Sequence, residues 1–142
     1  EMLRSLVGSE MCIRDSDYIV SDLLAIFVVK ILFIVFNMQK EEILRLIKET
    51  IAKTIQSGAK VILFGSQARG DAKEDSDWDI LILLNKDKVE LDDHDYISYP
   101  FFELGWNIDV QIHPILYTFK DWMERSFSPF YKNVEREGID LC

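Results

Sequence analysis

The chain has 142 residues, of which 49% are hydrophobic, and its 16 Lys and Arg against 25 Asp and Glu give a formal net charge of -9. This length supports one domain with a hydrophobic core but is short for two. The acidic charge argues against binding of long nucleic acids, because neutralising phosphates requires clustered Lys and Arg. Cys12 and Cys142 lie at opposite ends with no neighbouring His or second Cys. We therefore expect reduced thiols in a cytoplasmic protein rather than a zinc site or a disulfide framework.

The first 37 residues differ in character from the rest. Residues 5–16 resemble the conceptual translation of a sequencing adapter, a contaminant of reading frames assembled from short reads. On this interpretation residues 1–37 are an artefactual or non-native extension, Met38 is the natural start, and residues 38–142 form the functional domain. The remainder stays acidic when the extension is removed.

A second interpretation takes the apolar run over residues 18–36 as a membrane segment. Its uninterrupted part is shorter than the roughly 20 residues that a spanning helix needs, and Lys30 in its middle costs about 2.5 to 3.5 kcal/mol on the insertion scale. No small-residue cleavage site follows the run, which disfavours a secretory signal. Both interpretations leave the functional domain in the cytoplasm, and the first implies no membrane contact.

From residue 39 onward, helical and strand patterns follow one another. Apolar residues at helical spacing predict an amphipathic helix, and short β-branched runs bounded by Gly or polar loops predict strands. The first elements expected are a helix over 39–56, a buried strand over 61–64, a short helix within 66–73, a polar loop over 71–75 and a strand over 77–84. The later ones are an exposed loop over 85–95, a helix over 96–104, a third strand over 107–113 that Pro114 ends, and closing helices over 119–126 and 129–137.

Three carboxylates occupy positions suited to a metal site. Asp77 and Asp79 lie two apart on a predicted strand, so their side chains emerge on the same face. Asp109 alternates with apolar residues on the third predicted strand, which we expect to lie beside them. Nucleotidyl transfer uses two metal ions that stabilise the entering and leaving oxygens, and Mg2+ suits oxygen ligands completed by substrate phosphates.

A Gly-Ser turn precedes these carboxylates. Gly65 allows close approach of the backbone to a phosphate, and the start of the following helix presents free N-H groups to an anion. Ser66 adds a hydroxyl donor. Arg69 offers a planar donor for phosphate oxygens, or else pairs with a nearby acid.

In combination these motifs resemble the minimal nucleotidyltransferase branch of the DNA polymerase beta superfamily. The matching residues are Gly65-Ser66-x-Ala68-Arg69-Gly70, then Ser76-Asp77-x-Asp79, and later Asp109. The resemblance implies an α/β (α+β) fold like the polymerase beta palm, with a small mixed sheet of three to four strands flanked by helices. It also implies transfer of a nucleoside monophosphate, often AMP from ATP or another nucleoside triphosphate, to a hydroxyl. Gly65 and Ser66 would bind the triphosphate, Asp77, Asp79 and Asp109 would bind metal, and Asp109 would help to deprotonate the attacking hydroxyl.

The same resemblance bears on partners. Several members of the branch are antitoxins that modify a tyrosine of a HEPN-type toxin, while larger members carry a helical substrate domain for which this chain has no room. We therefore expect the acceptor to come from another protein, a second subunit or a free small molecule. Two alternatives stay open: a non-catalytic antitoxin with a relic nucleotide site, and half of an aminoglycoside-type nucleotidyltransferase. The acidic charge disfavours template-directed polymerisation.

The remaining His and aromatic residues are expected to be structural. His94 and His113 have no partner at metal-binding spacing, so we expect structural or solvent-facing roles. Trp78 is expected behind the carboxylate face. Trp106, Trp122 and the Phe and Tyr residues from Tyr96 onward are expected in the core rather than in a base-stacking surface.

Overall fold

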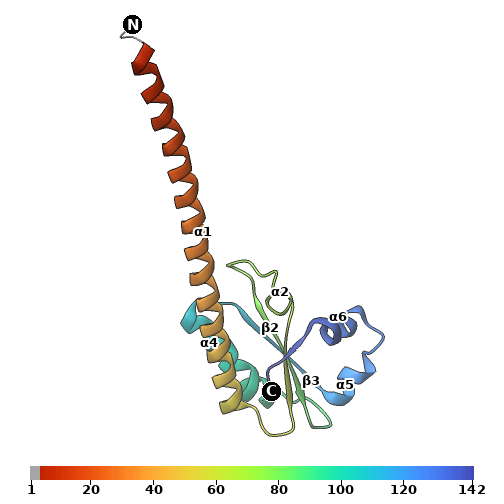
Figure 1. Ribbon diagram of the computed structural model, residues 1–142. Coiled ribbons are helices and arrows are strands. Elements are labelled where there is room, and N and C mark those ends of the chain that lie inside the picture. The colour runs from red at the N-terminus through yellow and green to blue at the C-terminus, as the bar shows by residue number, and fades with distance from the viewer. Residues whose placement is uncertain (1–3) are drawn as a thin grey trace. The chain divides into compact units, whose positions relative to one another are not determined.

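The chain forms two compact units that share one long helix. The computed structural model describes the backbone of residues 4–142 and the side chains of residues 20, 22–36 and 39–142. Helix α1 (Arg4–Thr54) begins in the first unit, Glu1–Glu42, and ends in the second, Ile43–Cys142 (Figure 1). The helix continues through Met38 without interruption, and the domain boundary at this residue stays a prediction.

The described part of the first unit is an apolar helix with exposed side chains. Its large hydrophobic residues between Val20 and Val35 are each at least 44% exposed. By length and composition alone, the segment Asp22–Thr54 is able to cross a membrane. The mean hydropathy of its 18-residue window is 2.0, and none of that window is buried. One such segment near the N-terminus is weak support for a membrane span.

A four-stranded mixed sheet organises the second unit. Its strands are β1 (Lys60–Phe64), β2 (Trp78–Leu84), β3 (Ile112–Thr118) and β4 (Ile139–Asp140). They lie in the order β3-β2-β1-β4, with β1 antiparallel to β2 and β4, and with β3 parallel to β2. The predicted fold class, a small mixed sheet flanked by helices, is confirmed.

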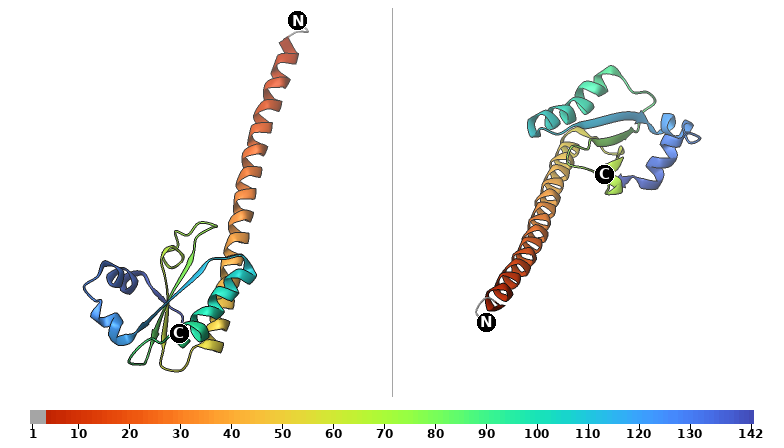
Figure 2. Two further views of the ribbon diagram at one scale, coloured as in Figure 1. Left: turned by 180° about the vertical axis from the view of Figure 1, so that it is seen from behind. Right: turned by 90° about the horizontal axis from the view of Figure 1, so that it is seen from above.

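Helices cover both faces of this sheet (Figures 1 and 2). The C-terminal part of α1 and helix α4 (Tyr99–Ile108) pack on one face, and helices α5 (Phe119–Glu124) and α6 (Pro129–Glu137) pack on the other. The shorter elements are α2 (Ser66–Arg69), α3 (Leu91–Asp93) and the π-helical turn η1 (His94–Ser98).

Alternation along β2 divides the core into two clusters. Trp78, Ile80 and Ile82 pack with residues of α1 and α4, whereas Leu81 and Leu83 pack with residues of α5 and α6. Because side chains alternate along a strand, Asp79 lies on the face of Leu81 and Leu83. The carboxylate therefore stands at one end of the face that α5 and α6 cover.

Several predicted elements are confirmed with small shifts at their ends. The first two strands and the helix over 129–137 are observed at or within one residue of the predicted bounds. The amphipathic helix expected over 39–56 is the C-terminal part of the longer helix α1, which begins at Arg4 and ends at Thr54. The predicted loop over 85–95 is wrong in its second half, because α3 and the first two residues of η1 lie there.

The third predicted strand is also misplaced. Helix α4 continues to Ile108, and β3 begins only at Ile112. Pro114 does not end the strand but lies inside it, opposite Ile80. Since β3 is an edge strand, it tolerates a residue that lacks a backbone N-H.

The aromatic residues divide between core and surface. Trp78 and Trp122 are 2% exposed, as predicted for core residues. Trp106 is 70% exposed and stacks with Phe102 on the outer side of α4, and Tyr96 is 75% exposed, so their prediction as core residues was wrong. Apolar rings are common on protein surfaces, which is why composition alone misplaced them.

Candidate functional site

The two predicted carboxylates meet where β1 ends and β2 begins. Asp77 directly precedes β2, and Asp79 is paired with Phe64 of β1 on one side and with His113 of β3 on the other. The side chain of Asp77 is 43% exposed and that of Asp79 is 30% exposed. Both groups are therefore fixed by the strand and still open to a ligand from solvent.

Gly65 lies against the carboxylate of Asp79. Its backbone has φ 76 and ψ -155, in a region that is essentially restricted to glycine. A Cβ atom at this position would stand 2.5 Å from Oδ2 of Asp79. Any larger residue would displace that carboxylate, so the chain has a physical need for glycine here. The predicted phosphate-binding turn and the predicted metal-binding carboxylates are thus brought together.

Ser66 starts the short helix α2 and is partly buried. The turn is held by the N-H of Arg69, which donates to the carbonyl of Gly65 at 3.1 Å, and by Nε2 of Gln67, which donates to the carbonyl of Ser76 at 3.1 Å. The second bond ties α2 to the loop that leads into β2. The turn that carries Ser66 is therefore held by two hydrogen bonds to its neighbours.

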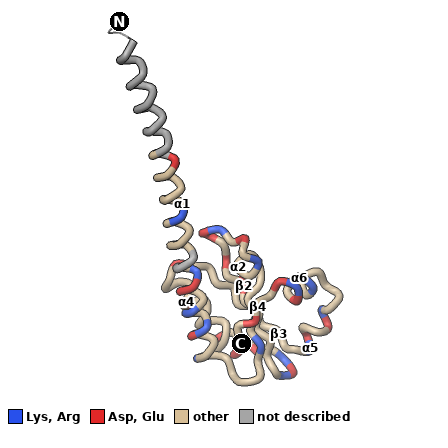
Figure 3. Tube along the Cα trace, in the orientation of Figure 1, with Lys and Arg blue, Asp and Glu red and all other residues tan. Residues whose placement is uncertain are grey.

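Arg69 is engaged by two carboxylates. Its guanidinium group lies 3.2 Å from Asp71 and 3.4 Å from Glu137, and its side chain is 42% exposed. The hydrogen bond that Arg69 donates to Asp71 contributes most to raising the pKa of Arg69, and the one that it donates to Glu137 adds to this effect. Lys and Arg are interspersed with Asp and Glu over the second unit (Figure 3). A phosphate contact by Arg69 would require this group to exchange one of its partners.

Asp109 is placed differently from the prediction. It is the C-cap of α4, with φ 55 in the left-handed region, and is exposed. The N-H of Val110 donates to the carbonyl of Gly105 at 2.9 Å and closes the helix at this point. Its expected place on a strand beside Asp77 and Asp79 was wrong, because the helix ends where the strand was expected. Within the described residues, no group of three or more His, Cys, Asp and Glu side chains is arranged to hold a metal ion.

His113 occupies the place beside Asp79 that sequence reasoning assigned to a carboxylate. Its Nδ1 lies 3.7 Å from Oδ1 of Asp79 and 3.8 Å from Oδ2 of Asp77. Burial is the main cause that raises the pKa of Asp79; His113 opposes this effect and Asp77 adds to it. His113 is 48% exposed, in agreement with the solvent-facing position that was one of its two expected roles. Its pairing with Asp79 was not predicted, because the strand was placed too early in the chain.

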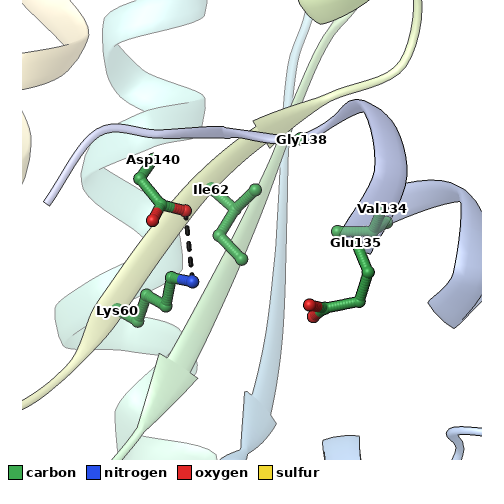
Figure 4. Close-up of a pocket in the computed structure, with 6 residues that line it drawn as sticks. All are labelled: Lys60, Ile62, Val134, Glu135, Gly138 and Asp140. Carbon is green, nitrogen blue, oxygen red and sulfur yellow. Dashed lines mark ion pairs between the residues drawn. The ribbon is translucent and has the colours of Figure 1, made fainter.

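A hollow of about 320 Å³ lies apart from these groups. It is lined by Lys60, Ile62, Val134, Glu135, Gly138 and Asp140 (Figure 4). Lys60 and Asp140, two of its lining residues, form an ion pair of 3.2 Å (Figure 4). None of the predicted site residues lines this hollow, so the candidate site is the end of the sheet at Asp77 and Asp79.

Comparison with known proteins identifies the family. A model of the nucleotidyltransferase domain matches residues 32–139. A protein of Methanocaldococcus jannaschii, MJ0141, which carries the provisional name protein adenylyltransferase, is 35% identical over 101 residues, 70% of this chain and 96% of the relative. A second protein of that organism with the same provisional name, MJ1305, is 37% identical over 70 residues, 49% of this chain and 48% of its own. A crystal structure described as a toxin-antitoxin with AMP-PNP is 22% identical with a TM-score of 0.48, over 68% of this chain and 69% of the other. Because the domain match spans more than half of the chain and MJ0141 is matched over nearly its full length, the chain belongs to the nucleotidyltransferase domain family, and the predicted nucleotidyltransferase activity class is confirmed.

Proposed function

We propose that this chain transfers AMP from ATP to a hydroxyl group of a protein, at the end of the sheet where Asp77 and Asp79 face Gly65. The observation that carries the proposal is the contact between Gly65 and Asp79, in which a Cβ would stand 2.5 Å from the carboxylate. A turn able to approach phosphates is thereby held against a carboxylate able to approach a cation. The names of the two archaeal relatives support adenylyl transfer to a protein.

The donor groups fit a magnesium ion that is shared with the substrate. Mg2+ is commonly held by one or two carboxylates together with substrate phosphates, and Asp77 and Asp79 supply two carboxylates on one partly exposed edge. When bound there, the ion neutralises charge on the phosphates. Asp109, the third ligand that the sequence resemblance implies, caps α4 and precedes β3 instead of lying on it.

The protein residues position the triphosphate for an in-line displacement. Gly65 and Ser66 bind it through backbone N-H groups and the Ser66 hydroxyl, so that the α-phosphorus faces the open edge beside Asp79. The acceptor oxygen forms a bond to the α-phosphorus while the bond to the bridging oxygen of the β-phosphate breaks. Pyrophosphate leaves, and the proton of the acceptor hydroxyl passes to solvent. Orientation and charge stabilisation by fixed groups account for the rate enhancement of such transfers.

The acceptor is a partner protein, for which a HEPN-type toxin is the candidate that the sequence resemblance supports. Under this proposal the chain acts in the cytoplasm as the antitoxin of that partner. Modification, and not contact alone, neutralises the toxin.

Transfer is tested with the full chain, Mg2+ and ATP that is labelled at either the α- or the γ-phosphorus. A HEPN-type protein encoded beside this chain serves as acceptor, with an unrelated protein as control. We expect the α-label, but not the γ-label, to become covalently bound to the acceptor, and Asp77→Asn to abolish the labelling while retaining the fold. Unlabelled acceptor would overturn the proposed transfer, and neutralisation of the toxin by Asp77→Asn would assign neutralisation to binding alone.

A further inference from the structure

Helix α4 carries apolar residues on two sides. Its inner side holds the buried Phe101 and Gly105 and packs on the sheet. Its outer side holds Tyr99, Phe102 and Trp106, which are 50%, 37% and 70% exposed and together form the α4 stripe. A helix that is apolar all round is usually buried all round. In the described part of the chain, however, nothing covers the α4 stripe.

The rings of the α4 stripe form one continuous surface. Residues three and four apart lie on the same side of an α-helix. Trp106 stacks with Phe102 at a centroid distance of 6.5 Å and meets Tyr99 edge-on at 6.0 Å. Aromatic residues, Trp and Tyr above all, are enriched at the centres of protein interfaces. The composition of the stripe is therefore that of an interface centre rather than of isolated surface residues.

The segment that carries the α4 stripe is strongly acidic. Residues 86–109 include seven Asp and Glu against two Lys, and one of these, Lys86, is paired with Asp93 at 2.8 Å. Glu103 is exposed on the outer side of α4, three residues before Trp106. Such a surface repels nucleic acids and anionic membranes, and it attracts a protein that carries Lys or Arg. These cations also bind to the faces of exposed aromatic rings.

The C-terminal end of α4 lies at the same end of the sheet as the candidate site. A Cβ added to Gly105 would stand 3.5 Å from Cγ1 of Ile112, the first residue of β3. Ile112 is paired with Trp78, which directly follows Asp77. Trp106 directly follows Gly105, so a protein that binds along the α4 stripe extends to the end of the sheet that holds the two carboxylates.

We propose that the α4 stripe is the docking surface for the acceptor protein, and that the segment of the acceptor that binds there combines apolar residues with Lys or Arg. The proposal rests on the proposed function, because it supplies that reaction with its acceptor. The apolar residues of the partner cover the exposed rings, and its cations pair with Glu103 and the other acidic residues around α4. Docking there brings the acceptor to the end of the sheet where Asp77 and Asp79 lie.

Docking is tested without any transfer reaction by two synthetic helical peptides that lack Trp, one of Leu and Lys and one of Leu and Glu. We expect the full chain to bind the Leu-Lys peptide and not the Leu-Glu peptide. Trp78 and Trp122 are 2% exposed, so quenching by acrylamide reports on Trp106, which the bound peptide should protect. No binding of the Leu-Lys peptide, or equal binding of both peptides, would overturn the proposal.

Matched variants locate the binding of the Leu-Lys peptide. Trp106→Ala should weaken it at least roughly 10-fold, as truncation at the centre of an interface does. Glu103→Lys should weaken it roughly 3-fold or more, because it places like charges together. Phe127→Ala and Glu124→Lys change exposed residues in or just after α5, on the other face of the sheet, and should bind the peptide like the unmodified chain. Equal weakening by these controls would overturn the docking surface.

The labelling assay connects docking with transfer. Trp106→Ala should raise the KM for the acceptor protein at least roughly 10-fold and leave the affinity for the ATP analogue unchanged. An unchanged KM would overturn the role of the α4 stripe in presenting the acceptor. If the unmodified chain binds the peptide at the α4 stripe but labels no acceptor, the proposed function is overturned and the binding surface is supported. Sedimentation that shows dimers of the chain, dissociated by Trp106→Ala, would assign the stripe to a second copy and overturn the proposal.

Discussion

Replacing Gly65 with Ala tests whether the phosphate-binding turn and Asp79 act as one unit. The added Cβ would lie 2.5 Å from Oδ2 of Asp79, well inside the 3.4 Å at which ordinary contact begins. The backbone at φ 76 and ψ -155 adds strain of about 1 to 3 kcal/mol for a residue other than glycine. We expect Gly65→Ala to lower the free energy of unfolding by at least this amount and to displace the carboxylate of Asp79 from its place at the start of β2.

Gly70 provides a matched control. It also has a positive φ, 82, but nothing lies within 4 Å of the position that its Cβ would take. Gly70→Ala should therefore cost only the left-handed backbone strain of about 1 to 2 kcal/mol. Urea unfolding measures both stabilities, and titration with a non-hydrolysable ATP analogue and Mn2+ measures nucleotide binding. We expect Gly65→Ala to lose nucleotide binding and Gly70→Ala to keep it.

A double-mutant cycle isolates the contact. In an Asp79→Ala background the overlapping oxygen is absent, and of the three atoms nearest to the added Cβ at residue 65 only the Cβ of residue 79, at 3.6 Å, remains. The destabilisation by Gly65→Ala should then fall to the backbone strain alone. An equal cost in both backgrounds, or nucleotide binding by Gly65→Ala as tight as that of Gly70→Ala, would refute the reasoning.

Three further variants separate function from stability. Burial raises the pKa of Asp79 in the folded chain, so the free energy of unfolding falls as the pH rises through the range between the unfolded and the folded pKa. We therefore expect Asp79→Asn to be more stable than the unmodified chain at neutral pH. Urea unfolding should show that this difference vanishes in acid. Glycine suits the left-handed backbone at Asp109, where φ is 55, so Asp109→Gly should change the free energy of unfolding by no more than about 1 kcal/mol. We expect its metal affinity to be unchanged. A loss of metal binding would identify Asp109 as a ligand. Arg69→Gln should change the free energy of unfolding by less than about 1 kcal/mol, because the ion pairs of Arg69 are exposed. It should weaken binding of the ATP analogue roughly 10-fold, because one charged hydrogen bond to phosphate is lost. Unaltered affinity would confine Arg69 to its pairs with Asp71 and Glu137.

The stretch over residues 61–84 could be predicted because local chemistry determines it. Two apolar runs bounded by glycine and polar residues specify neighbouring strands, and the two-residue spacing of Asp77 and Asp79 specifies a shared face. These features need no knowledge of distant contacts. The structure confirms the strands and adds the approach of Asp79 to Gly65.

The stretch from the end of α4 to β3 could not be predicted in the same way. Ile108, Val110 and Ile112 alternate as a strand would, but the end of a helix followed by a left-handed residue also accommodates them. Pro114 suggested a strand end, which holds for central strands and fails at an edge. Because a shift along the chain changes which residue faces Asp79, the residue paired with Asp79 on β3 is His113 and not Asp109. The two-residue strand β4 carries too little pattern for recognition.

The central claim is that Asp77 and Asp79 hold a cation that carries the nucleotide. Calorimetric titration of the full chain with a non-hydrolysable ATP analogue measures this directly and needs no acceptor protein. We predict binding that requires a divalent cation and is lost in the Asp77→Asn and Asp79→Asn variants while their folding is preserved. Equal binding with and without the cation, or by the folded variants, would contradict the account.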